Sequence, residues 1–372
     1  MTAPRRVLVA MSGGVDSSVA AALLAQAGYD VAGATMRLGD AEADARDEGG
    51  CCSLAAVEDA RRVAHRIGIP FHVLDFRDAF RTAVREPFVD AYLRGETPNP
   101  CVACNRFVKF GAFLAKARVL GFDAVATGHY ARVEEDPAAP GRFRLLRGLD
   151  PGKDQSYALA QLGQDVLSRL LLPVGGLAKA ETRRLAAELG LAVADKPDSQ
   201  EICFIPDDDH AAYILAQRPG SGRPGRFVDR AGNVLGAHGG IHRFTVGQRK
   251  GLGRAFGKPM YVVSLDAATG DVVLGEERDL YRDGAVLGDV VFTREEYRAE
   301  AAAASADGTG LPVRAQVRYG KDAVPARLLL AGESARLAFD RPVRAVTPGQ
   351  AAAFYRGDEV LGGATIRRPD ED

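Results

Sequence analysis

Short apolar runs alternate with longer amphipathic stretches over the first 210 residues. The run over 5–11, RRVLVAM, predicts a buried strand, and the turn SGGVDSS after it leads into an alanine- and leucine-rich helix that ends at Gly28. Further strands are predicted over 29–38, 71–76 and 123–128, and helices over 53–68 and 164–190. Alternation of this kind is typical of an α/β fold with a doubly wound parallel sheet.

The pattern changes near residue 210. From RPGSGRPGRFVD at 218–229 onward, short β-branched runs alternate with glycine-rich turns. The runs over 260–266, 270–275 and 324–330 predict strands of small β domains. The alanine-rich stretch 299–306, followed by DGTG, is expected to be a loop insertion.

These patterns predict three domains in a chain of 372 residues, a length that suits two or three domains of roughly 150 residues. The N-terminal α/β domain is expected over 1–210, a small central domain over 211–280 and a C-terminal β-barrel over 281–372.

Composition argues against a membrane-spanning protein and against a disulfide-rich secreted protein. The chain is 47% hydrophobic and 26% charged, and no apolar run approaches the roughly 18 residues of a membrane span. The N-terminus lacks the apolar segment of a signal peptide, and five cysteines are too few for a disulfide framework, so we expect a cytoplasmic protein without a membrane partner. A net charge of −1 gives no overall attraction to nucleic acid, so such a partner must bind local patches.

The stretch SGGVDSS, residues 12–18, lies where a strand is expected to become a helix. Unpaired backbone N–H groups and the positive helix end make this an anion site, and the serines add hydroxyl donors. The loop lacks the lysine of the GxxxxGK[ST] pattern and does not match GxGxxG. It suits a pyrophosphate that leaves when an adenylate forms, with Asp16 as a candidate magnesium ligand.

The alternative is an ordinary turn in which Ser12 or Asp16 caps the helix. Glycines, an acid and three serines coincide at the strand end, which favours the anion site. The stretch resembles the PP-loop of the ATP pyrophosphatases, a superfamily whose members adenylate a substrate carbonyl. The resemblance implies ATP as the nucleotide.

Cysteines stand in three places. Cys101 and Cys104 lie in NPCVACN, a stretch expected to be a loop, Cys51 and Cys52 are adjacent, and Cys203 lies in the polar segment KPDSQEICFIP. Half a zinc site, a redox pair and inert thiols are the alternatives for Cys101 and Cys104, but no partner pair at zinc spacing follows. A phosphate loop that activates a carbonyl, together with loop cysteines, favours sulfur transfer through a persulfide.

Nine stretches in order resemble the bacterial tRNA-uridine 2-sulfurtransferases, also called the tRNA-specific 2-thiouridylase family. They are AMSGGVDSS, GCCS, TPNPCVACNRFVKF, ATGHYAR, GKDQSYAL, KPDSQEICFIP, FTVGQRKGLG, RYG and TPGQAAAFY. The resemblance spans essentially the whole chain. It implies that the wobble uridine in the anticodon stem-loop of tRNA is adenylated at its C2 carbonyl and then thiolated, with ATP and Mg²⁺ required and a persulfide donor or carrier protein as partner.

The resemblance also assigns residues. Cys104 is the implied nucleophile and Cys203 the implied persulfide carrier, and the two close a disulfide at the end of the cycle. The implied nucleotide contacts are Ala10, Met11, Ser12, Gly13, Gly14, Val15, Asp16, Ser17, Met36 and Gly128. The implied tRNA contacts are Asn99, Pro100, Cys101, His129, Lys153, Asp154, Gln155, Arg318, Tyr319 and Gln350. Many relatives have aspartate where this chain has Cys101, so a proton-transfer role for that thiol would need a tuned pKa.

Charge in the C-terminal part agrees with an RNA partner. Residues 311–350 hold seven Lys or Arg against three acids. A solvated face gives the same count. Two other functions remain open from the sequence: a PP-loop ligase that adds nitrogen, and an RNA-binding protein whose cysteines hold zinc or an iron–sulfur cluster.

Overall fold

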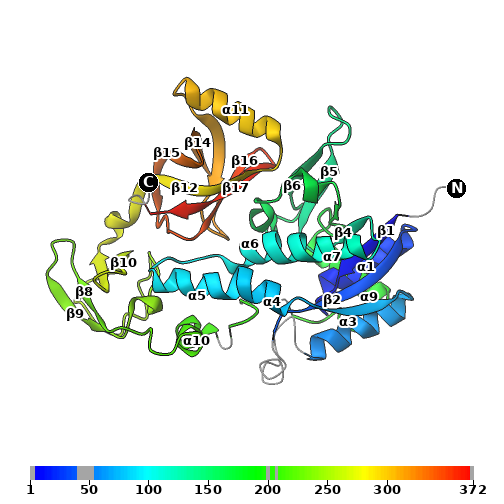
Figure 1. Cartoon of the computed structure of the whole chain (residues 1–372), viewed down its shortest axis with the longest axis horizontal. Helices are drawn as coiled ribbons and strands as arrows, with labels where there is room; N and C mark the ends of the chain where they lie inside the picture. The colour runs from blue at the N-terminus through cyan, green and yellow to red at the C-terminus, as the bar shows by residue number, and fades with distance from the viewer. Residues whose placement is uncertain (1–4, 40–53, 198–201, 206–207, 369–372) are drawn as a thin grey trace. The chain divides into compact units, whose positions relative to one another are not determined.

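The computed structural model describes residues 5–39, 54–197, 202–205 and 208–368 (Figure 1). They fall into two compact units. Unit 1 comprises Met1–Val84, Cys101–Pro206 and Asp358–Val360, and unit 2 comprises Arg85–Pro100, Asp207–Gly357 and Leu361–Asp372. Cys51 and Cys52 lie outside the described residues.

Unit 1 contains a parallel five-stranded sheet in the order β3-β2-β1-β4-β7. Its strands are β1 (Arg6–Ala10), β2 (Asp30–Arg37), β3 (Phe71–Asp75), β4 (Ala124–Ala126) and β7 (Leu170–Leu171). The strand order reverses between β1 and β4, the place where parallel sheets of this kind bind ligands. This arrangement confirms the predicted doubly wound α/β fold.

The α-helices of unit 1 lie around this sheet, and one of them, α6, carries Cys101. They are α1 (Val15–Gln26), α3 (Leu54–Ile67), α4 (Arg77–Phe80), α6 (Pro100–Ala103), α7 (Phe113–Val119), α8 (Gln164–Leu167) and α9 (Lys179–Glu188). Two π-helices, η1 (Arg81–Arg85) and η2 (Cys104–Ala112), a 3₁₀ turn η3 (Ser156–Leu159) and a hairpin of β5 (Ala131–Glu135) and β6 (Phe143–Arg147) complete the regular elements of this part of the chain.

The core of unit 1 follows from the pattern of β1. Val7, Leu8 and Val9 are fully buried because a central parallel strand is covered on both faces. Val7 and Val9 pack in one cluster with residues of α1, α3 and α9, and helix α1 contacts both of the other two. The sheet is therefore held against a layer of helices that begins directly after the phosphate loop.

The helix predicted over 164–190 is wrong as one continuous element. The structure has the short helix α8, then strand β7 at the sheet edge, and only then α9. Leu170 and Leu171 pair with Val125 and Ala126, so apolar residues expected on a helix face instead extend the parallel sheet. Pro173 and two glycines after β7 keep the next helix from starting before Lys179.

Unit 2 contains a four-stranded sheet in the order β10-β11-β8-β9. Its strands are β8 (Gly225–Val228), β9 (Val234–His238), β10 (Tyr261–Leu265) and β11 (Asp271–Gly275), and the short helical elements nearby are η5 (Ile241–Arg243) and η6 (Glu277–Leu280). Helices α5 (Glu86–Leu93) and α10 (His210–Gln217) contact each other and η5. The predicted strands at 260–266 and 270–275 are confirmed.

The rest of unit 2 is a closed antiparallel barrel. Its strands run in the order β12-β15-β14-β13-β16-β17, and β12 also pairs with β17, which closes the ring. The elements are β12 (Tyr281–Phe292), α11 (Glu295–Ala306), β13 (Leu311–Gln316), β14 (Val324–Ala331), β15 (Ser334–Arg344), β16 (Ala351–Arg356) and β17 (Glu359–Arg367). The predicted C-terminal β-barrel is therefore confirmed as a fold.

The loop insertion expected at 299–306 is wrong, because these residues form most of helix α11. Alanine has the highest intrinsic helix propensity, and the buried Tyr297 and Ala301, four residues apart, pack into the barrel core. DGTG then ends the helix, with Gly308 and Gly310 at positive φ.

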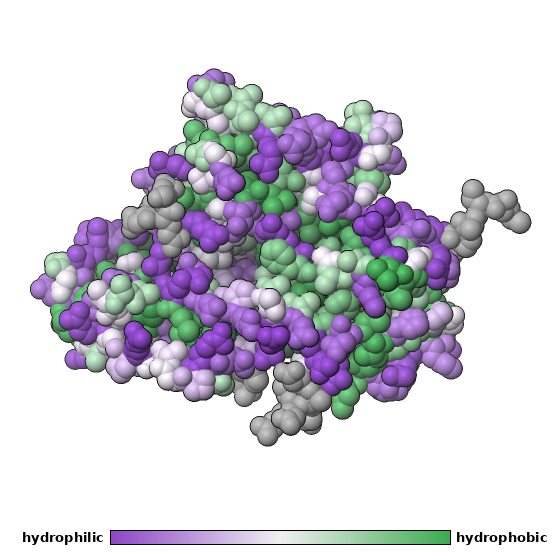
Figure 2. Space-filling model, viewed as in Figure 1, coloured by the Kyte–Doolittle hydropathy of each residue, from purple (hydrophilic) through white to green (hydrophobic). Residues whose placement is uncertain are grey.

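Domain limits at 210 and 280 stay a prediction. Helix α5, which lies inside the predicted first domain, groups with unit 2. On the face seen in Figure 2, hydrophilic residues dominate and hydrophobic residues form scattered patches. None of the helices in the described residues is long and apolar enough to cross a bilayer.

Candidate active site

The phosphate loop connects the carboxyl end of β1 to α1, as predicted. Gly14 is the N-cap of α1 and carries no side chain, so no side-chain cap occupies the first amides of the helix. Ser17 and Ser18 donate to the Gly14 carbonyl at 3.2 and 2.8 Å, and the Ser12 amide donates to Ser17 Oγ at 3.2 Å. The hydroxyls therefore hold the turn in shape while the helix end stays available to an anion.

Asp16 does not cap the helix. Its carboxylate accepts two hydrogen bonds from Lys179 Nζ, at 2.7 and 2.8 Å, and one from Tyr130 Oη at 2.7 Å. The Lys179 side chain is 10% exposed and that of Asp16 is 30% exposed. Tyr130 Oη also lies 3.0 Å from Thr182 Oγ1. A lysine from the first turn of α9 thus supplies the positive charge that the loop sequence lacks.

A second lysine reaches the loop from further along the chain. Lys196 Nζ donates to the Gly13 carbonyl at 3.0 Å and to Asp59 Oδ2 at 2.7 Å. Gly13 has φ +71°, and a Cβ placed there would lie 2.2 Å from the Ala56 carbonyl oxygen. Glycine is therefore required at this position by both backbone conformation and space.

Gly128 after β4 packs directly on the phosphate loop. A Cβ at this position would lie 2.5 Å from the backbone carbon of Asp16 and from the amide nitrogen of Ser17. The loops after β1 and β4 are therefore in contact at the point where the strand order reverses. Met36 lies at the end of the adjacent strand β2, and Ala10, Met11 and Val15 are buried along β1 and the start of α1.

Replacing Gly128 with alanine is expected to displace the phosphate loop. The added methyl group would meet backbone atoms that cannot move independently, so we expect a loss of about 1–3 kcal/mol in unfolding free energy and weaker ATP binding. Thermal unfolding and ATP titration measure both effects. Gly176→Ala is the matched control, because no heavy atom lies within 4 Å of its Cβ position. Equal melting temperature and ATP affinity in both variants would contradict this account.

Cys101 and Cys104 lie in helical structure, so the expected loop is wrong. Pro100 begins helix α6, where its fixed φ suits the first turn, Cys101 is exposed, and Cys104 is the first residue of the nine-residue π-helix η2 and is buried. π-helical turns cost more than α-helical ones and are frequent at functional sites. Arg106 stacks on the Phe107 ring, and Phe107 is 49% exposed one turn after Cys104.

Cys203 is exposed and belongs to the same unit as Cys104. The next residue, Phe204, packs edge-on against Phe80 at the end of α4, with ring centroids 5.4 Å apart. Helix α4 in turn packs against η2, which begins at Cys104. One aromatic contact thus connects the segment that carries Cys203 to α4, and α4 packs against the helix η2 that begins at Cys104. No group of three or more potential metal ligands occurs in the described part of the chain.

His129 after β4 contacts the Cys104 helix. Its ring lies 5.9 Å from that of Phe110 in η2, and its Nδ1 is 2.7 Å from Thr127 Oγ1. Burial lowers the pKa of His129 well below its usual value, and the charge of Lys109 lowers it further. His129 is therefore neutral at pH 7 and can act as a hydrogen-bond partner without carrying charge.

This lowered pKa predicts an acid-dependent loss of stability. The unfolded chain binds a proton at His129 near pH 6.5 and the folded chain only at lower pH, so the unfolding free energy is constant above about pH 7 and falls as pH drops through 6.5. His129→Gln is expected to reduce that slope by at most about 1.4 kcal/mol per pH unit. Thermal melts from pH 7.5 to 5.5 measure it. Burial also lowers the pKa of His210, His238 and His242, which would maintain a residual slope. An unchanged slope in His129→Gln would contradict the assignment.

The sequence of the chain matches known protein families over most of its length. Residues 5–207 match the model described as a tRNA methyl transferase HUP domain, 213–276 a tRNA methyl transferase PRC-barrel domain, and 298–366 an aminomethyltransferase beta-barrel domain. The chain is 52% identical to the tRNA-specific 2-thiouridylase MnmA of Heliobacterium modesticaldum, over 97% of this chain and 92% of that protein. The chain belongs to the tRNA-specific 2-thiouridylase family.

Other members of the tRNA-specific 2-thiouridylase family align at similar length. The protein of Carboxydothermus hydrogenoformans is 49% identical and that of Clostridioides difficile 47% identical, each over 98% of both chains. The predicted family is therefore confirmed, and so is the expected class of enzyme. The individual site residues are not tested by these alignments and stay predictions.

The residues that the 2-thiouridylase resemblance assigns to tRNA lie in both units. In unit 1, Asp154 accepts hydrogen bonds from Arg147, the Gly148 amide and Ser156, which fix the GKDQ turn. Gln155 Oε1 accepts from the Tyr130 amide at 3.0 Å. This turn is therefore hydrogen-bonded to Tyr130, whose hydroxyl group also contacts Asp16. Lys153 of the same turn is half-buried.

In unit 2, Gln350 Nε2 donates to the Thr97 carbonyl at 2.8 Å, and the Thr97 amide donates to the Pro348 carbonyl at 2.9 Å. The barrel segment thus holds the stretch that leads into Asn99 and Pro100. Tyr319 is 55% exposed and Arg318 is half-buried beside it. An exposed tyrosine next to an arginine suits contact with a base and a phosphate.

Sequence reasoning did not single out Lys179, Lys196 or Tyr130 as site residues, although Tyr130 lies in ATGHYAR and Lys196 begins KPDSQEICFIP. Lys179 and Asp16 are 163 residues apart, and Lys196 and Gly13 are 183 apart. Lys179 lies in the interior of the helix predicted over 164–190, where it resembles any surface lysine. The structure begins α9 at Lys179, and a lysine at a helix N-terminus is unfavourable to the helix dipole unless a partner compensates.

Proposed function

We propose that this protein converts a uridine of tRNA to 2-thiouridine in an ATP-dependent reaction. The uncapped helix end with Lys179 beside Asp16, in the same unit as Cys104 and Cys203, carries this proposal. The relatives named tRNA-specific 2-thiouridylase support it. Methyl transfer, the activity named in the description of two domain models, fits the site less well, because it needs neither a phosphate loop nor two thiols.

The residues around the loop fit a nucleoside triphosphate with Mg²⁺. The free amides of α1 and the Lys179 ammonium supply positive potential for phosphates. Among the described residues, Asp16 Oδ2 accepts one hydrogen bond, from Lys179 at 2.8 Å, so it keeps a lone pair for a cation. One carboxylate is sufficient when phosphate oxygens and water complete an octahedral Mg²⁺ site. Mg²⁺ bound there would neutralise charge on the departing pyrophosphate.

The reaction would proceed in two parts. In the first, the uridine O2 attacks the α-phosphorus of ATP, and pyrophosphate leaves from the α1 helix end, so that the base is adenylated at C2. In the second, the terminal sulfur of a Cys203 persulfide attacks C2 and AMP leaves with the oxygen. Cys104 then attacks Sγ of Cys203, the sulfur stays on C2, and a disulfide closes between the two cysteines until a dithiol reduces it.

The partners follow from this chemistry. Cys203 is exposed, as a thiol that receives sulfur from a persulfide donor or carrier protein must be. The substrate base must leave its stack to reach C2, which favours the anticodon loop of tRNA over a helical stem. A cytoplasmic location is part of the proposal, because ATP, tRNA and reduced thiols occur together there.

Mass spectrometry of tRNA nucleosides tests the proposal. Unmodified tRNA is incubated with the protein, Mg-ATP and a persulfide donor, and the nucleosides are compared with those of reactions without ATP. The proposal predicts 2-thiouridine, together with one AMP and one pyrophosphate per modified base. Pyrophosphate release without modified tRNA would show that the phosphate loop works on another carbonyl, as in a nitrogen-adding ligase.

A further inference from the structure

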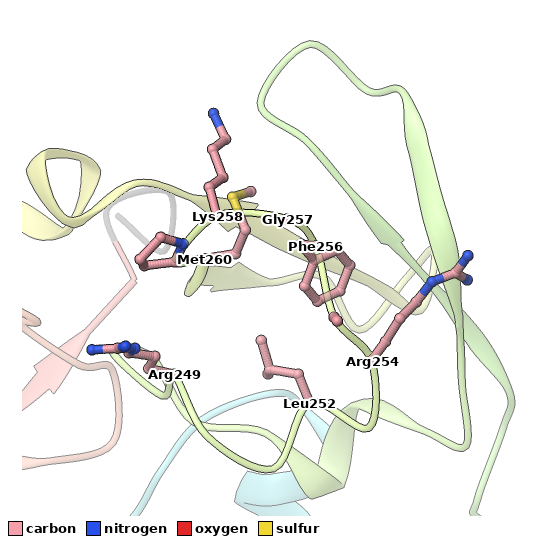
Figure 3. Close-up of a pocket in the computed structure, with 9 residues that line it drawn as sticks. Arg249, Leu252, Arg254, Phe256, Gly257, Lys258 and Met260 are labelled. Atoms are coloured by element: carbon pink, nitrogen blue, oxygen red, sulfur yellow. The ribbon is translucent and has the colours of Figure 1, made fainter.

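A cavity outside the catalytic unit lies in the loop between η5 and β10. The segment is GQRKGLGRAFGKPM at 247–260, called here the basic loop. Residues Arg249, Leu252, Arg254, Phe256, Lys258 and Met260 are among those that line a cavity of about 420 Å³. In Figure 3, Leu252 and Phe256 point into the hollow, whereas Lys258 and Arg254 extend away from it. The floor is therefore apolar and the rim cationic.

The segment that contains this cavity carries charge of one sign. Residues 230–265 contain six Lys or Arg and no Asp or Glu, a purer basic segment than the stretch 311–350. Lys258 pairs with Glu276 at 2.8 Å and Arg230 with Asp279 at 2.6 Å. Arg249 and Arg254 form no ion pair with any residue that the structure describes, and both are exposed. Their charges are available to a polyanion.

The backbone of the basic loop also offers donors. The loop is anchored to β10 by hydrogen bonds between Gly247 and Val262 and between Val262 and Gln248. Between these anchors and Met260, no amide donates a hydrogen bond to another described residue. Gly251, Gly253 and Gly257 have φ near +70° and carry no side chain, so no Cβ hinders a phosphate that approaches the backbone at these turns.

The aromatic floor is held in place by the domain core. Phe256 is half-buried and packs edge-on against Phe227, with ring centroids 5.8 Å apart, while Leu252 and Met260 belong to the same core cluster. One face of a fixed aromatic ring beside free cations is what an unstacked nucleotide uses: its base stacks and its phosphates contact arginines.

We propose that this cavity binds one unstacked nucleotide of the RNA substrate, with the base on Phe256 and the flanking phosphates on Arg249, Arg254 and the glycine amides. The inference rests on the proposed function. An acidic protein, such as a sulfur carrier, would match the charge, but carboxylates have no use for a planar apolar floor of this size. The cavity would therefore add affinity for tRNA at a place separate from the base that is thiolated.

The test uses the full-length protein and unmodified tRNA. Arg249→Ala removes an exposed side chain without an ion pair, and Phe256→Leu keeps apolar packing but removes the π face. The matched control is Lys116→Ala, an exposed lysine in α7. Dissociation constants for tRNA are measured at several salt concentrations, and thermal melts check that each variant is folded.

Arg249→Ala should weaken tRNA binding and reduce the slope of log K against log salt by about 0.7–0.9, the value for one lost phosphate contact. Phe256→Leu should weaken binding about 5- to 100-fold with an unchanged slope. Lys116→Ala should match the wild type. Wild-type affinity and slope in both pocket variants would overturn the inference, as would unchanged tRNA affinity with slower sulfur loading from a carrier protein.

These measurements also separate this inference from the proposed function. If the wild-type protein binds tRNA and forms 2-thiouridine while the pocket variants bind equally well, only the cavity assignment fails. If the wild-type protein neither binds tRNA nor forms 2-thiouridine, the proposed function fails, and the cavity assignment fails with it.

Discussion

Cys203→Ser is expected to abolish 2-thiouridine formation, with a loss of roughly 10⁴-fold or more in rate, while ATP binding remains. A serine hydroxyl cannot carry a persulfide, so no sulfur reaches C2 even when the base is adenylated. The substitution is nearly isosteric at an exposed position, so folding should be unaffected. Nucleoside mass spectrometry measures the product, and pyrophosphate release reports the first half-reaction separately.

Cys104→Ser should block the cycle at a different point. The persulfide on Cys203 still forms, but no thiolate attacks its Sγ, so tRNA should accumulate as a covalent adduct on Cys203. Denaturing gels with labelled tRNA, before and after added dithiothreitol, would show this adduct as a reducible band. Such a band in Cys104→Ser and none in Cys203→Ser distinguishes the two roles.

Cys101→Ser is the matched control for the Cys203→Ser and Cys104→Ser variants. It removes an exposed thiol three residues before Cys104, yet Cys203 should still load sulfur and the disulfide between Cys104 and Cys203 should still close. Peptide mass spectrometry after one turnover identifies which cysteines are joined. A disulfide between Cys101 and Cys203 instead would reverse the assignment of the two thiols in α6 and η2.

Local sequence patterns predicted the elements that have strong local signals. Gly13 and Gly14 predict a turn, and the alternating apolar and amphipathic stretches around them predict β1, α1 and the parallel sheet. Both signals depend only on residues that are close together in the sequence. The turn over 12–18 between β1 and α1 was predicted for the same reason. Its open helix end is visible in the sequence as a glycine where a capping side chain would otherwise stand.

The features that the sequence did not predict depend on contacts across long separations. Strand β7 is recognised only by its pairing with β4, since Leu170 and Leu171 alone are too short to show a period. Helix α11 was missed because alanine is small enough to occur in loops, and burial of Ala301 in the barrel decides its state. The π-helical winding of η2 likewise has no sequence signature, although its first residue is Cys104.

Lys179→Ala is expected to lower the rate of pyrophosphate release by about 10²–10³-fold, as loss of one group that stabilises developing charge does in other enzymes. Lys179 Nζ contacts both oxygens of Asp16, and its side chain is 10% exposed, so little water can replace it. Without it, an uncompensated carboxylate would face the phosphates and repel them. The ATP concentration at half-maximal rate should rise together with the loss of rate.

A purely structural role for Lys179 predicts something else. Loss of a partly buried ion pair would lower the unfolding free energy by about 1–3 kcal/mol, discounted because Asp16 remains 30% exposed, but would leave pyrophosphate release per folded molecule intact. Arg184→Ala on the same helix is the control, since Arg184 pairs with Glu188 at the surface at 2.6 Å and should affect neither quantity by much. Restoration of pyrophosphate release in Lys179→Ala by Asp16→Asn would identify carboxylate repulsion as the cause, because the double variant removes the charge that Lys179 compensates. If the double variant is as slow as Lys179→Ala while Asp16→Asn alone keeps the wild-type rate at saturating Mg²⁺, the ammonium acts on the phosphates themselves, in place of the lysine that the loop lacks.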